Sequence, residues 1–467
     1  MKTLFALLAV LVFASAPALP GPAGAYSLSM DRDRMSVEAR GEPLARILEG
    51  LAARGVKVYA DPGANPPVTL SLADRDARRV LDALVRPYSW AAVWDTVQTP
   101  DGPFHRLAEL SVFRPGFREA VRPLVVRPVL DVARDPATGE LYVNGEVLIR
   151  FAPGTPEAEI QRIMTLLGAT VLDRHEATGV WRVKLPEGAE VYDAIRALEK
   201  EAAVAGAEPN QVFRAPSLAP GPGAAPAAFA IREVAVQGDG PAVAVLDTGL
   251  LSNAGLDALV RASTDIFAPG GPVTDPQGHG TQMAWVASGL VSPQGAPETA
   301  TSAIPVVAVR VFDDNGCTSA FHVAEALDFA AENGARVVNL SWGSETKSEL
   351  LEEAFSLAEE RGMILVAAAG NEPTGTPMYP AAYGSVLGVG ALGAEGRWEN
   401  SNYGDFVNIY APGFAVLPVG NDGPPGTYAG TSIASAYVSR LIAAQLAKTP
   451  QASLAQILSA ILNGGAE

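Results

Sequence analysis

The chain has 467 residues, 48% of them hydrophobic, which is enough for about three domains with buried cores. Its formal net charge of −17 argues against nucleic acid as a partner, because binding phosphates requires a basic surface. The single cysteine, Cys317, excludes an internal disulfide framework.

The first 25 residues have the pattern of a secretory signal peptide. Lys2 precedes the apolar run LFALLAVLVF, and small residues and prolines follow it. The run is shorter than the about 20 apolar residues that span a bilayer. A basic start, an apolar middle and a small-residue exit are typical of an export signal. We expect cleavage after Ala25 and a protein that is periplasmic, attached to the cell envelope or extracellular. An uncleaved membrane anchor is the alternative.

Residues 26–120 predict a small α/β domain. The strand-like runs MSVEAR, VKVYAD and VTLSLA alternate with the helical patterns PLARILEGLAARG and DARRVLDALVRPY. No catalytic constellation is present in this segment. Its pattern resembles the short N-terminal domain of secretins and TonB-dependent receptors. The resemblance implies docking to a partner in the cell envelope, and a simple spacer domain is the alternative.

A connector at 121–142 leads to a second small domain at 143–213. Its predicted order is the strand GEVLIRFAP, the helix PEAEIQRIMTLLGA, the strands TVLDRHEATG and VWRVKLP, the helix VYDAIRALEKEAAV and the extended stretch AGAEPNQVFRA. This βαββαβ order is the ferredoxin-like arrangement. Residues 214–230 are rich in proline, glycine and alanine and predict a flexible linker.

Residues 231–467 predict a doubly wound, mostly parallel α/β domain. The runs AVAVLD, PVVAVRVF, ARVVNLSW, MILVAAAG and VLGVGAL are almost continuously apolar, as is typical of parallel strands covered on both faces. Helical patterns such as HVAEALDFAAENG and ELLEEAFSLAEERG lie between them. In such folds, sites form at the carboxyl ends of the strands.

Three polar residues in this domain point to acyl-transfer chemistry. Asp247 ends a buried strand, His279 lies between two glycines at a helix start, and Ser432 begins another helix. Each alone has a structural explanation, as a turn residue, a helix-start polar group or an N-cap. Together they supply the orienting acid, the base and the nucleophile that a serine hydrolase needs.

The chain order Asp, His, Ser is one of the known triad orders, and the residues around it resemble the subtilisin-like serine proteases. The resemblance covers nearly all of residues 240–460 through the motifs VVNLSWGS, LVAAAGNE, YPAAY, SNYGDFVNIYAPG and YAGTSIASA. It implies an endopeptidase with Asp247, His279 and Ser432 as the triad. It also implies that the Asn371 side chain and the Ser432 N–H bind the oxyanion. Residues 143–213 would then be a prodomain that assists folding and blocks the cleft of a self-processing precursor.

The resemblance further implies a cleft in which an extended peptide substrate lies between two edge strands. The predicted substrate contacts are Ser341, Trp342, Gly343, Ala368, Ala369, Gly370, Gly316 and Thr318. Trp342 stands at a position where the family often has a smaller or aliphatic residue, and core packing is its alternative role. No charged residue is evident at the floor of the cleft, so an apolar or broad preference is expected. The glycines beside His279 and before Ser432 are expected to leave room for a substrate backbone.

The edge strand that contains Gly316 and Thr318 also contains Cys317. For this cysteine, a buried apolar position is favoured over an accessible thiol.

Some features depart from the family or leave alternatives. Ile433 and Ala436 replace the usual methionine and proline after the serine, a loss that should be tolerated because the proline does no chemistry.

No metal site is predicted, since the remaining histidines have no ligand spacing and no EF-hand string is visible. The chemistry should need no cofactor, and the sequence leaves structural calcium undecided. A catalytically silent scaffold protein docked in the envelope is the alternative function.

Overall fold

The computed structural model describes residues 26–52, 54–61, 63–99, 102–124, 128–221, 235–236, 240–251, 256–297, 302–417 and 426–463. The predicted signal peptide lies outside these residues. The chain divides between residues 126 and 127 into two compact parts. No helix in the described ranges is long and apolar enough to cross a membrane.

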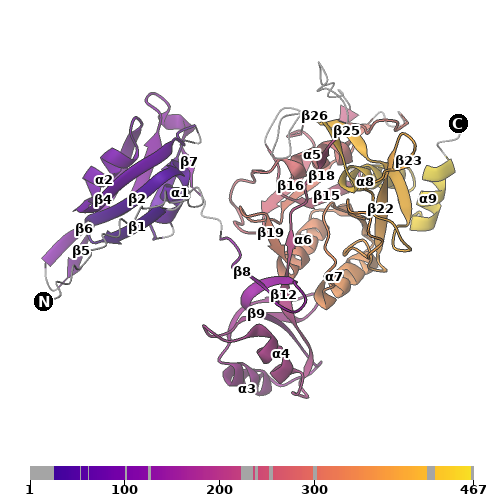
Figure 1. The fold of residues 1–467 in the computed structure, drawn as a ribbon, viewed down its shortest axis with the longest axis horizontal. Helices are drawn as coiled ribbons and strands as arrows, with labels where there is room; N and C mark the ends of the chain where they lie inside the picture. Colours follow the sequence, from indigo (N-terminus) through magenta and orange to yellow (C-terminus); the bar gives the residue numbers. More distant parts are fainter. Residues whose placement is uncertain are drawn as a thin grey trace, which may run out of the picture. The chain divides into compact units, whose positions relative to one another are not determined.

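The first part, the N-terminal unit, combines two sheets with two short helices (Figure 1). The sheets have the orders β1-β2-β4 and β5-β6-β3-β7. The buried sides of both helices, which include Ile47 and Leu81, join the strands in one core. The combination of strands and helices in one core agrees with the small domain of both element types that the sequence predicted. Its elements are β1 (Tyr26–Asp31), β2 (Arg34–Pro43), α1 (Leu44–Ala52), β3 (Lys57–Ala60), β4 (Pro67–Asp76), α2 (Ala77–Leu84), β5 (Ser89–Thr99), β6 (Gly102–Phe113), the 3₁₀ turn Arg118–Ala120 and β7 (Arg122–Pro123).

The second part begins with the middle unit, residues 132–214, in which a sheet of order β10-β11-β9-β12 carries helices α3 and α4. Side chains of β9 alternate between two cores. Ile149 packs with α3 and α4, whereas Leu148 packs against the unit that follows. The middle unit is therefore buried on both faces of its sheet. Its elements are β8 (Val132–Arg134), β9 (Leu141–Phe151), α3 (Glu157–Leu167), β10 (Thr170–His175), β11 (Val180–Lys184), α4 (Val191–Leu198) and β12 (Val204–Arg214).

The α/β unit, residues 240–463, is built on an eight-stranded sheet (Figure 1). The strand order is β16-β18-β15-β20-β21-β22-β23, β24 also pairs with β22, and only the β22–β23 pairing is antiparallel. The strands of this sheet are β15 (Ala242–Asp247), β16 (Val260–Asp265), β18 (Val306–Arg310), β20 (Ala335–Leu340), β21 (Ile364–Ala368), β22 (Val386–Gly393), β23 (Gly396–Arg397) and β24 (Ile409–Pro412).

Helices cover both faces of this sheet. They are α5 (His279–Ser288), α6 (Ala320–Glu332), α7 (Glu349–Glu360), α8 (Thr431–Lys448) and α9 (Leu454–Asn463). Short strands outside the main sheet are β13 (Ala219–Pro220), β14 (Ala235–Val236), β17 (Ser302–Ala303), β19 (Cys317–Ser319), β25 (Phe414–Leu417) and β26 (Gly426–Ala429).

The alternation of side chains along β15 decides which helices meet the end of that strand. Val243 joins the core formed with α5 and α8, whereas Leu246 joins the core formed with α6 and α7. Asp247 therefore faces the layer of α5 and α8. These two helices pack against each other and begin at His279 and Thr431. The predicted doubly wound fold is confirmed.

Candidate active site

Asp247 and His279 form a buried hydrogen-bonded pair. The His279 Nδ1 lies 2.8 Å from the Asp247 Oδ1, and both residues are fully buried. The Thr248 backbone N–H donates to the same carboxylate oxygen over 2.7 Å and fixes its orientation. The His279 Nε2 has no hydrogen-bond partner among the described residues. Since Nδ1 faces the carboxylate, Nε2 is the nitrogen left to exchange a proton.

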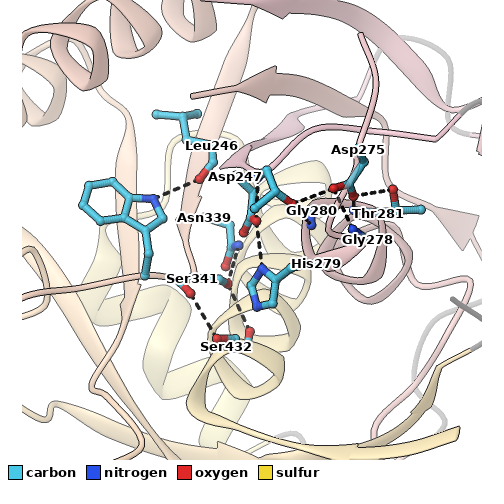
Figure 2. A network of polar contacts seen from close by, with 12 residues as sticks. Leu246, Asp247, Asp275, Gly278, His279, Gly280, Thr281, Asn339, Ser341 and Ser432 are labelled. Atoms are coloured by element: carbon cyan, nitrogen blue, oxygen red, sulfur yellow. Dashed lines mark hydrogen bonds and ion pairs between the residues drawn. The ribbon is translucent and has the colours of Figure 1, made fainter. Parts of the chain in front are cut away.

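Ser432 is the second residue of α8 and is 2% exposed. Figure 2 shows the imidazole of His279 between Asp247 and Ser432. The Ser432 hydroxyl donates to the Ser341 carbonyl over 3.0 Å rather than to the imidazole. Without substrate, catalytic hydrogen bonds are often long or poorly aligned, and they commonly tighten only when substrate is bound. The arrangement places the hydroxyl at the start of a helix, beside the base.

The Asn371 side chain is held with its amide nitrogen available. Its Oδ1 accepts from the Thr431 backbone N–H and from the Thr431 hydroxyl, both over 2.9 Å. The Thr431 hydroxyl in turn accepts from the Gly370 backbone N–H over 3.2 Å. Two donors facing Oδ1 fix the amide orientation, so that Nδ2 is the group left to donate. Asn371 lines the same pocket as Ser432.

Asp275 organises the start of α5, a role that the sequence analysis missed. Its carboxylate, 3% exposed, accepts four hydrogen bonds of 2.7 to 2.8 Å. The donors are the Thr248 hydroxyl, the Gly278 N–H and the N–H and hydroxyl of Thr281. Asp275 therefore ties the turn after Asp247 to the helix that begins with His279 (Figure 2). The sequence signal that could have revealed this role is an acidic residue four positions before His279.

A glycine beside His279 serves packing within the protein. A Cβ on Gly280 would lie 2.4 Å from the Gly249 carbonyl oxygen, a backbone atom that cannot move aside. The prediction that this glycine makes room for a substrate backbone is therefore wrong, because the space belongs to the turn after Asp247. Gly430, two residues before Ser432, does leave room for a peptide. A Cβ at this position would lie 2.6 Å from the side chain of Leu218, which belongs to the segment that follows the middle unit.

A pocket of about 350 Å³ adjoins Ser432. Its lining includes five predicted substrate contacts from β21 and from the residues that follow β20 and β21, namely Ser341, Trp342, Gly343, Ala368 and Gly370. Ala369 is fully buried and does not line it. The pocket is also lined by Met378 and by two carboxylate residues, Glu345 and Glu372. Both glutamates are exposed, so the expectation that no charged residue lies at the floor of the cleft stays a prediction.

Trp342 serves both of the roles that the sequence left open. It lines the pocket, yet it is only 1% exposed and its ring contacts those of Phe213 and Phe312 at centroid distances of 5.4 and 6.0 Å. Its indole N–H donates to the Leu246 carbonyl over 3.0 Å. Trp342 therefore joins the substrate-facing strand to the strand that ends in Asp247.

A buried polar network supports Ser341 and the helix of Ser432 from beneath. The Asn339 amide donates to the Ser341 hydroxyl over 2.8 Å and accepts from the Ser435 hydroxyl over 2.9 Å. The Ser341 hydroxyl also donates to the Ser432 carbonyl over 3.2 Å. All three supporting residues are at most 1% exposed. The network holds the carboxyl end of β20 and the first turn of α8 in one register.

The other predicted edge strand, β19, pairs with the last strand of the middle unit. Phe213 is opposite Thr318, and Arg214 is opposite Cys317. The Ala215 N–H donates to the Gly316 carbonyl over 2.8 Å. Gly316 and Thr318 therefore do bind an extended chain, which here is the protein's own.

Cys317 is 4% exposed, and burial raises the pKa of its thiol. It packs against Val143 and Val212 of the middle unit. The thiol is therefore a buried apolar group in this state of the protein.

Residues 214–221, the cleft segment, cross the site. Pro216 and Ser217 line the pocket that contains Ser432. Beyond them, Leu218 is 6% exposed within the core of α5 and α8. Ala219 and Pro220 form β13, which pairs antiparallel with β26, and the Gly221 N–H donates to the Thr427 carbonyl over 2.9 Å.

The predicted flexible linker is wrong for residues 214–221. Proline-, glycine- and alanine-rich composition predicts a chain without its own core, but backbone hydrogen bonds to strands distant in sequence hold this one. The rest of the predicted linker, 222–230, lies outside the described residues.

The other ionisable clusters show no further ligand set. Throughout the ranges that the structure describes, no group of three or more histidine, cysteine, aspartate or glutamate side chains is placed to hold a metal ion. His175 and His322 lie at the boundary of the middle and α/β units, where His322 bonds to Ser319 and His175 contacts Asp328. His105 lies on β6 of the N-terminal unit.

Two protein-family models match different segments of the second part of the chain. The subtilase family model matches residues 238–465, and the model of the fervidolysin N-terminal prodomain matches residues 130–210. The middle unit is thus similar to a known protease prodomain, and the α/β unit to the protease itself.

Individual proteins agree with both matches. Subtilisin Savinase from Lederbergia lenta is 38% identical over 231 residues, which are 48% of this chain and 83% of that protein. A thermophilic serine proteinase from Bacillus sp. (strain AK1) is 31% identical over 314 residues, 65% of this chain and 78% of that protein. Fervidolysin from Fervidobacterium pennivorans, a keratinolytic enzyme related to subtilisin, shares the fold with a TM-score of 0.52 at 23% identity, over 70% of this chain and 57% of that chain. This chain is a serine endopeptidase with a prodomain and belongs to the subtilase family.

Proposed function

We propose that this protein is an exported endopeptidase that cuts peptide bonds through Asp247, His279 and Ser432, and that it is made as a precursor that cuts itself. The observation that carries the proposal is the buried hydrogen bond of 2.8 Å between Asp247 and His279, with Nε2 of the imidazole left for Ser432. The cleft segment lies across the same site, so the first substrate is already bound.

The chemistry follows from the geometry of these groups. His279 takes the proton of the Ser432 hydroxyl as the hydroxyl oxygen attacks the scissile carbonyl, and Asp247 stabilises the imidazolium that forms. The Asn371 side-chain amide and the Ser432 N–H, at the start of α8, donate to the oxyanion. His279 then gives its proton to the leaving amine, and water hydrolyses the acyl-enzyme. All of these groups come from the chain, so the proposal includes no cofactor.

The prodomain binds the protease as a substrate would and also through contacts outside the cleft. The Glu208 carboxylate accepts from the Ser348 hydroxyl and the Glu349 N–H, each over 2.8 Å, at the N-terminus of α7. A carboxylate at this position is stabilised by the helix dipole. The Asn210 Oδ1 accepts from the Phe321 N–H over 3.3 Å on α6. These contacts support inhibition of the protease by its own prodomain.

The cleft segment limits where the first cut falls. Only Pro216 and Ser217 of this segment line the pocket with Ser432, while Arg214 and Ala219 are paired to strands on either side. We therefore place the scissile bond next to Ser217, either before or after it. The mature chain then begins at Ser217 or Leu218.

Export and docking complete the proposal. The apolar run at Leu4 to Phe13 supports export, because it has the form of a signal peptide. The N-terminal unit has its own core and no part in the proposed chemistry, which supports a separate role in binding a partner in the cell envelope.

One experiment tests the enzyme proposal. Purified wild-type protein and Ser432→Ala are treated with a fluorophosphonate probe and followed by intact mass. Wild type should be labelled once, at Ser432, and should be cut beside Ser217, whereas Ser432→Ala should be neither labelled nor cut. Cutting at the same bond in both proteins would show that another protease matures this chain. Equal labelling would exclude Ser432 as the nucleophile.

A further inference from the structure

Arg310, the last residue of β18, is a buried charged residue that has no part in the proposed reaction. It is fully buried, and its backbone lies in parallel register between Asp247 of β15 and Asp265 of β16. Ala308, two residues earlier, packs in the core of α5 and α8, so the Arg310 side chain lies on the same face of the sheet as Asp247. Burying a guanidinium is costly unless its charge and its N–H groups are satisfied, so its partners indicate its role.

The guanidinium of Arg310 bridges the loop before α5 and the loop before β19. Its Nη1 donates to the Thr274 hydroxyl of the first loop over 2.8 Å. Its Nε donates to the Phe312 carbonyl of the second loop over 3.0 Å, and its Nη2 donates to the Asp314 carboxylate of that loop. The Asp265 carboxylate, fully buried and 3.7 Å from Nη1, supplies a countercharge. The donors of a guanidinium form a rigid fork, so these partners are held at fixed distances from one another.

The loop before α5 contacts the elements that carry both members of the Asp–His pair. Thr274 precedes Asp275, whose carboxylate accepts from backbone N–H groups at the start of α5. The Thr274 carbonyl also packs against the turn after Asp247, since a Cβ on Gly249 would lie 1.9 Å from its oxygen. A displacement of Thr274 would therefore move the start of the His279 helix and the turn after Asp247 together.

The loop before β19 shapes the strand that binds the chain's own extended segment. The Asp313 carboxylate, which is buried, accepts from the Asn315 and Cys317 N–H groups over 2.9 and 2.8 Å. Strand β19 then pairs with β12, the last strand of the prodomain. The two loops also meet directly, because a Cβ on Gly316 would lie 2.6 Å from the side-chain nitrogen of Gln277. The guanidinium therefore lies where the loop of the catalytic base meets this strand.

We propose that Arg310 is a positioning residue for peptide-bond cleavage. It holds the loop before α5 in register with β19, so that the His279 imidazole meets the scissile bond of a peptide paired with that strand. The proposal rests on the proposed roles of His279 and Ser432. Pairing with β19 binds the peptide whether or not the loop is held, whereas proton transfer requires the imidazole within hydrogen-bond reach. Loosening the link should therefore lower kcat and leave KM nearly unchanged.

Two substitutions break this link at opposite ends and leave Arg310 in place. Thr274→Val removes the hydroxyl that accepts from Nη1, and Asp314→Ala removes the carboxylate that accepts from Nη2. Both residues are exposed, so neither change empties the core. Arg310→Lys keeps the positive charge but replaces the fork by a single ammonium group. Thr264→Val makes the same chemical change as Thr274→Val on β16, outside the link, and is the control.

Each protein is expressed as the full chain, allowed to cut itself and separated from its prodomain. The fluorophosphonate probe counts the active sites, kinetics on a peptide anilide long enough to pair with β19 gives kcat per site and KM, and thermal unfolding gives stability. Thr274→Val and Asp314→Ala should each lower kcat by about tenfold, with KM within about twofold of wild type. The double variant should fall no further than the lower single variant, because both changes release the same link. Arg310→Lys should lower kcat as well, and Thr264→Val should match wild type.

Three results would overturn the positioning role while labelling of Ser432 stands. They are a lower unfolding temperature with unchanged kcat in the single variants, losses of kcat that multiply in the double variant, and wild-type kcat in Arg310→Lys. A wild type that is neither labelled nor cut would overturn the proposed nucleophile and the role of Arg310 together.

Discussion

Asn371 is the residue whose proposed role separates binding from catalysis. Its Oδ1 accepts from Thr431, so Nδ2 is left to donate. In the proposed role, Nδ2 donates to the substrate oxygen mainly in the transition state, where negative charge develops on that oxygen. We expect Asn371→Ala to lower kcat by about 100- to 1,000-fold and to leave KM nearly unchanged. Steady-state kinetics on a peptide anilide measures both. A variant in which KM rises and kcat stays constant would show that Asn371 binds the ground state.

A second prediction for a single residue concerns Asp275. Asp275→Asn replaces one acceptor oxygen by an NH₂ group, which then faces two of the four donors that now meet the carboxylate. Leaving buried donors unsatisfied should lower the free energy of unfolding by about 2 to 3 kcal/mol. Because the same donors position His279, kcat should fall at temperatures where the variant is still folded. Thermal unfolding and kinetics on the same sample distinguish the two effects, and normal kcat in a destabilised variant would limit Asp275 to stability.

Residue types in short motifs could be read from the sequence, whereas contacts made by loops could not. Asp247, His279 and Ser432 each lie at the end of a strand or the start of a helix, where the apolar pattern fixes their position. The structure brings Asp247 and His279 together as the motifs indicated, and their catalytic roles stay a prediction. Glu345 and Glu372 lie in loops after β20 and β21, so nothing in the local pattern showed that they face one pocket.

Strand β19 is the element whose surroundings change most when the prodomain leaves. Cys317 is buried because Val143 and Val212 of the prodomain cover it. We expect a thiol reagent such as Ellman's reagent to react slowly with the precursor and at least about tenfold faster with enzyme that has released its prodomain. The uncut Ser432→Ala protein serves as the protected control. Equal rates in both proteins would mean that the apolar surroundings of Cys317 do not depend on the prodomain.

Strand β13 shows why the course of some elements escapes prediction. Ala219 and Pro220 have no apolar alternation, and proline, glycine and alanine dominate the residues around them. Their partner strand β26 lies some 200 residues further along the chain, so pairing arises from tertiary structure alone. The helices and the parallel strands of the α/β unit were predictable, because each has its own apolar period.

At the scale of the whole molecule, an ionisable cluster links the prodomain interface to pH. Burial is the main cause that raises the pKa of Glu325, on α6, to about 7, and Asp173 of the prodomain and Asp328 raise it further. Arg182 and His175 of the prodomain act in the opposite direction. Strands β10 and β12 of the prodomain pack against α6, so we expect the bound prodomain to supply part of this burial and thereby to favour protonated Glu325. This contribution to binding is complete below the ordinary value of 4.5 and is lost as the pH rises through about 7.

The prediction is that the cut prodomain dissociates faster at pH 8.5 than at pH 5.5, and that Glu325→Gln flattens this difference. A glutamine mimics the protonated acid at every pH, so the variant should behave like wild type at the acidic end. Dissociation can be followed by the recovery of peptidase activity after dilution, corrected for the pH dependence of the enzyme itself. Glu332→Gln, an exposed position on the same helix, is the control. An unchanged pH profile in Glu325→Gln would assign the dependence to other groups.

The pairing of β13 with β26 has a consequence for the direction of the first reaction. When Ser432 cuts beside Ser217, the leaving group is the amine of the new N-terminus, and buried Leu218 and the β13 pairing hold this amine next to the acyl-enzyme. A tethered amine has a high effective concentration, so it competes with water for the acyl group and restores the original bond.

We therefore expect the first cut to be reversible until residues 218–221 leave β26. In water enriched in oxygen-18, hydrolysis places a heavy oxygen in the new carboxyl group, and re-acylation of Ser432 followed by attack of the amine returns part of that label to the intact chain. Uncut precursor should then acquire a heavy oxygen in the carbonyl of the scissile bond. Uncut precursor that stays unlabelled while the cut form accumulates would show that the cut is not reversed.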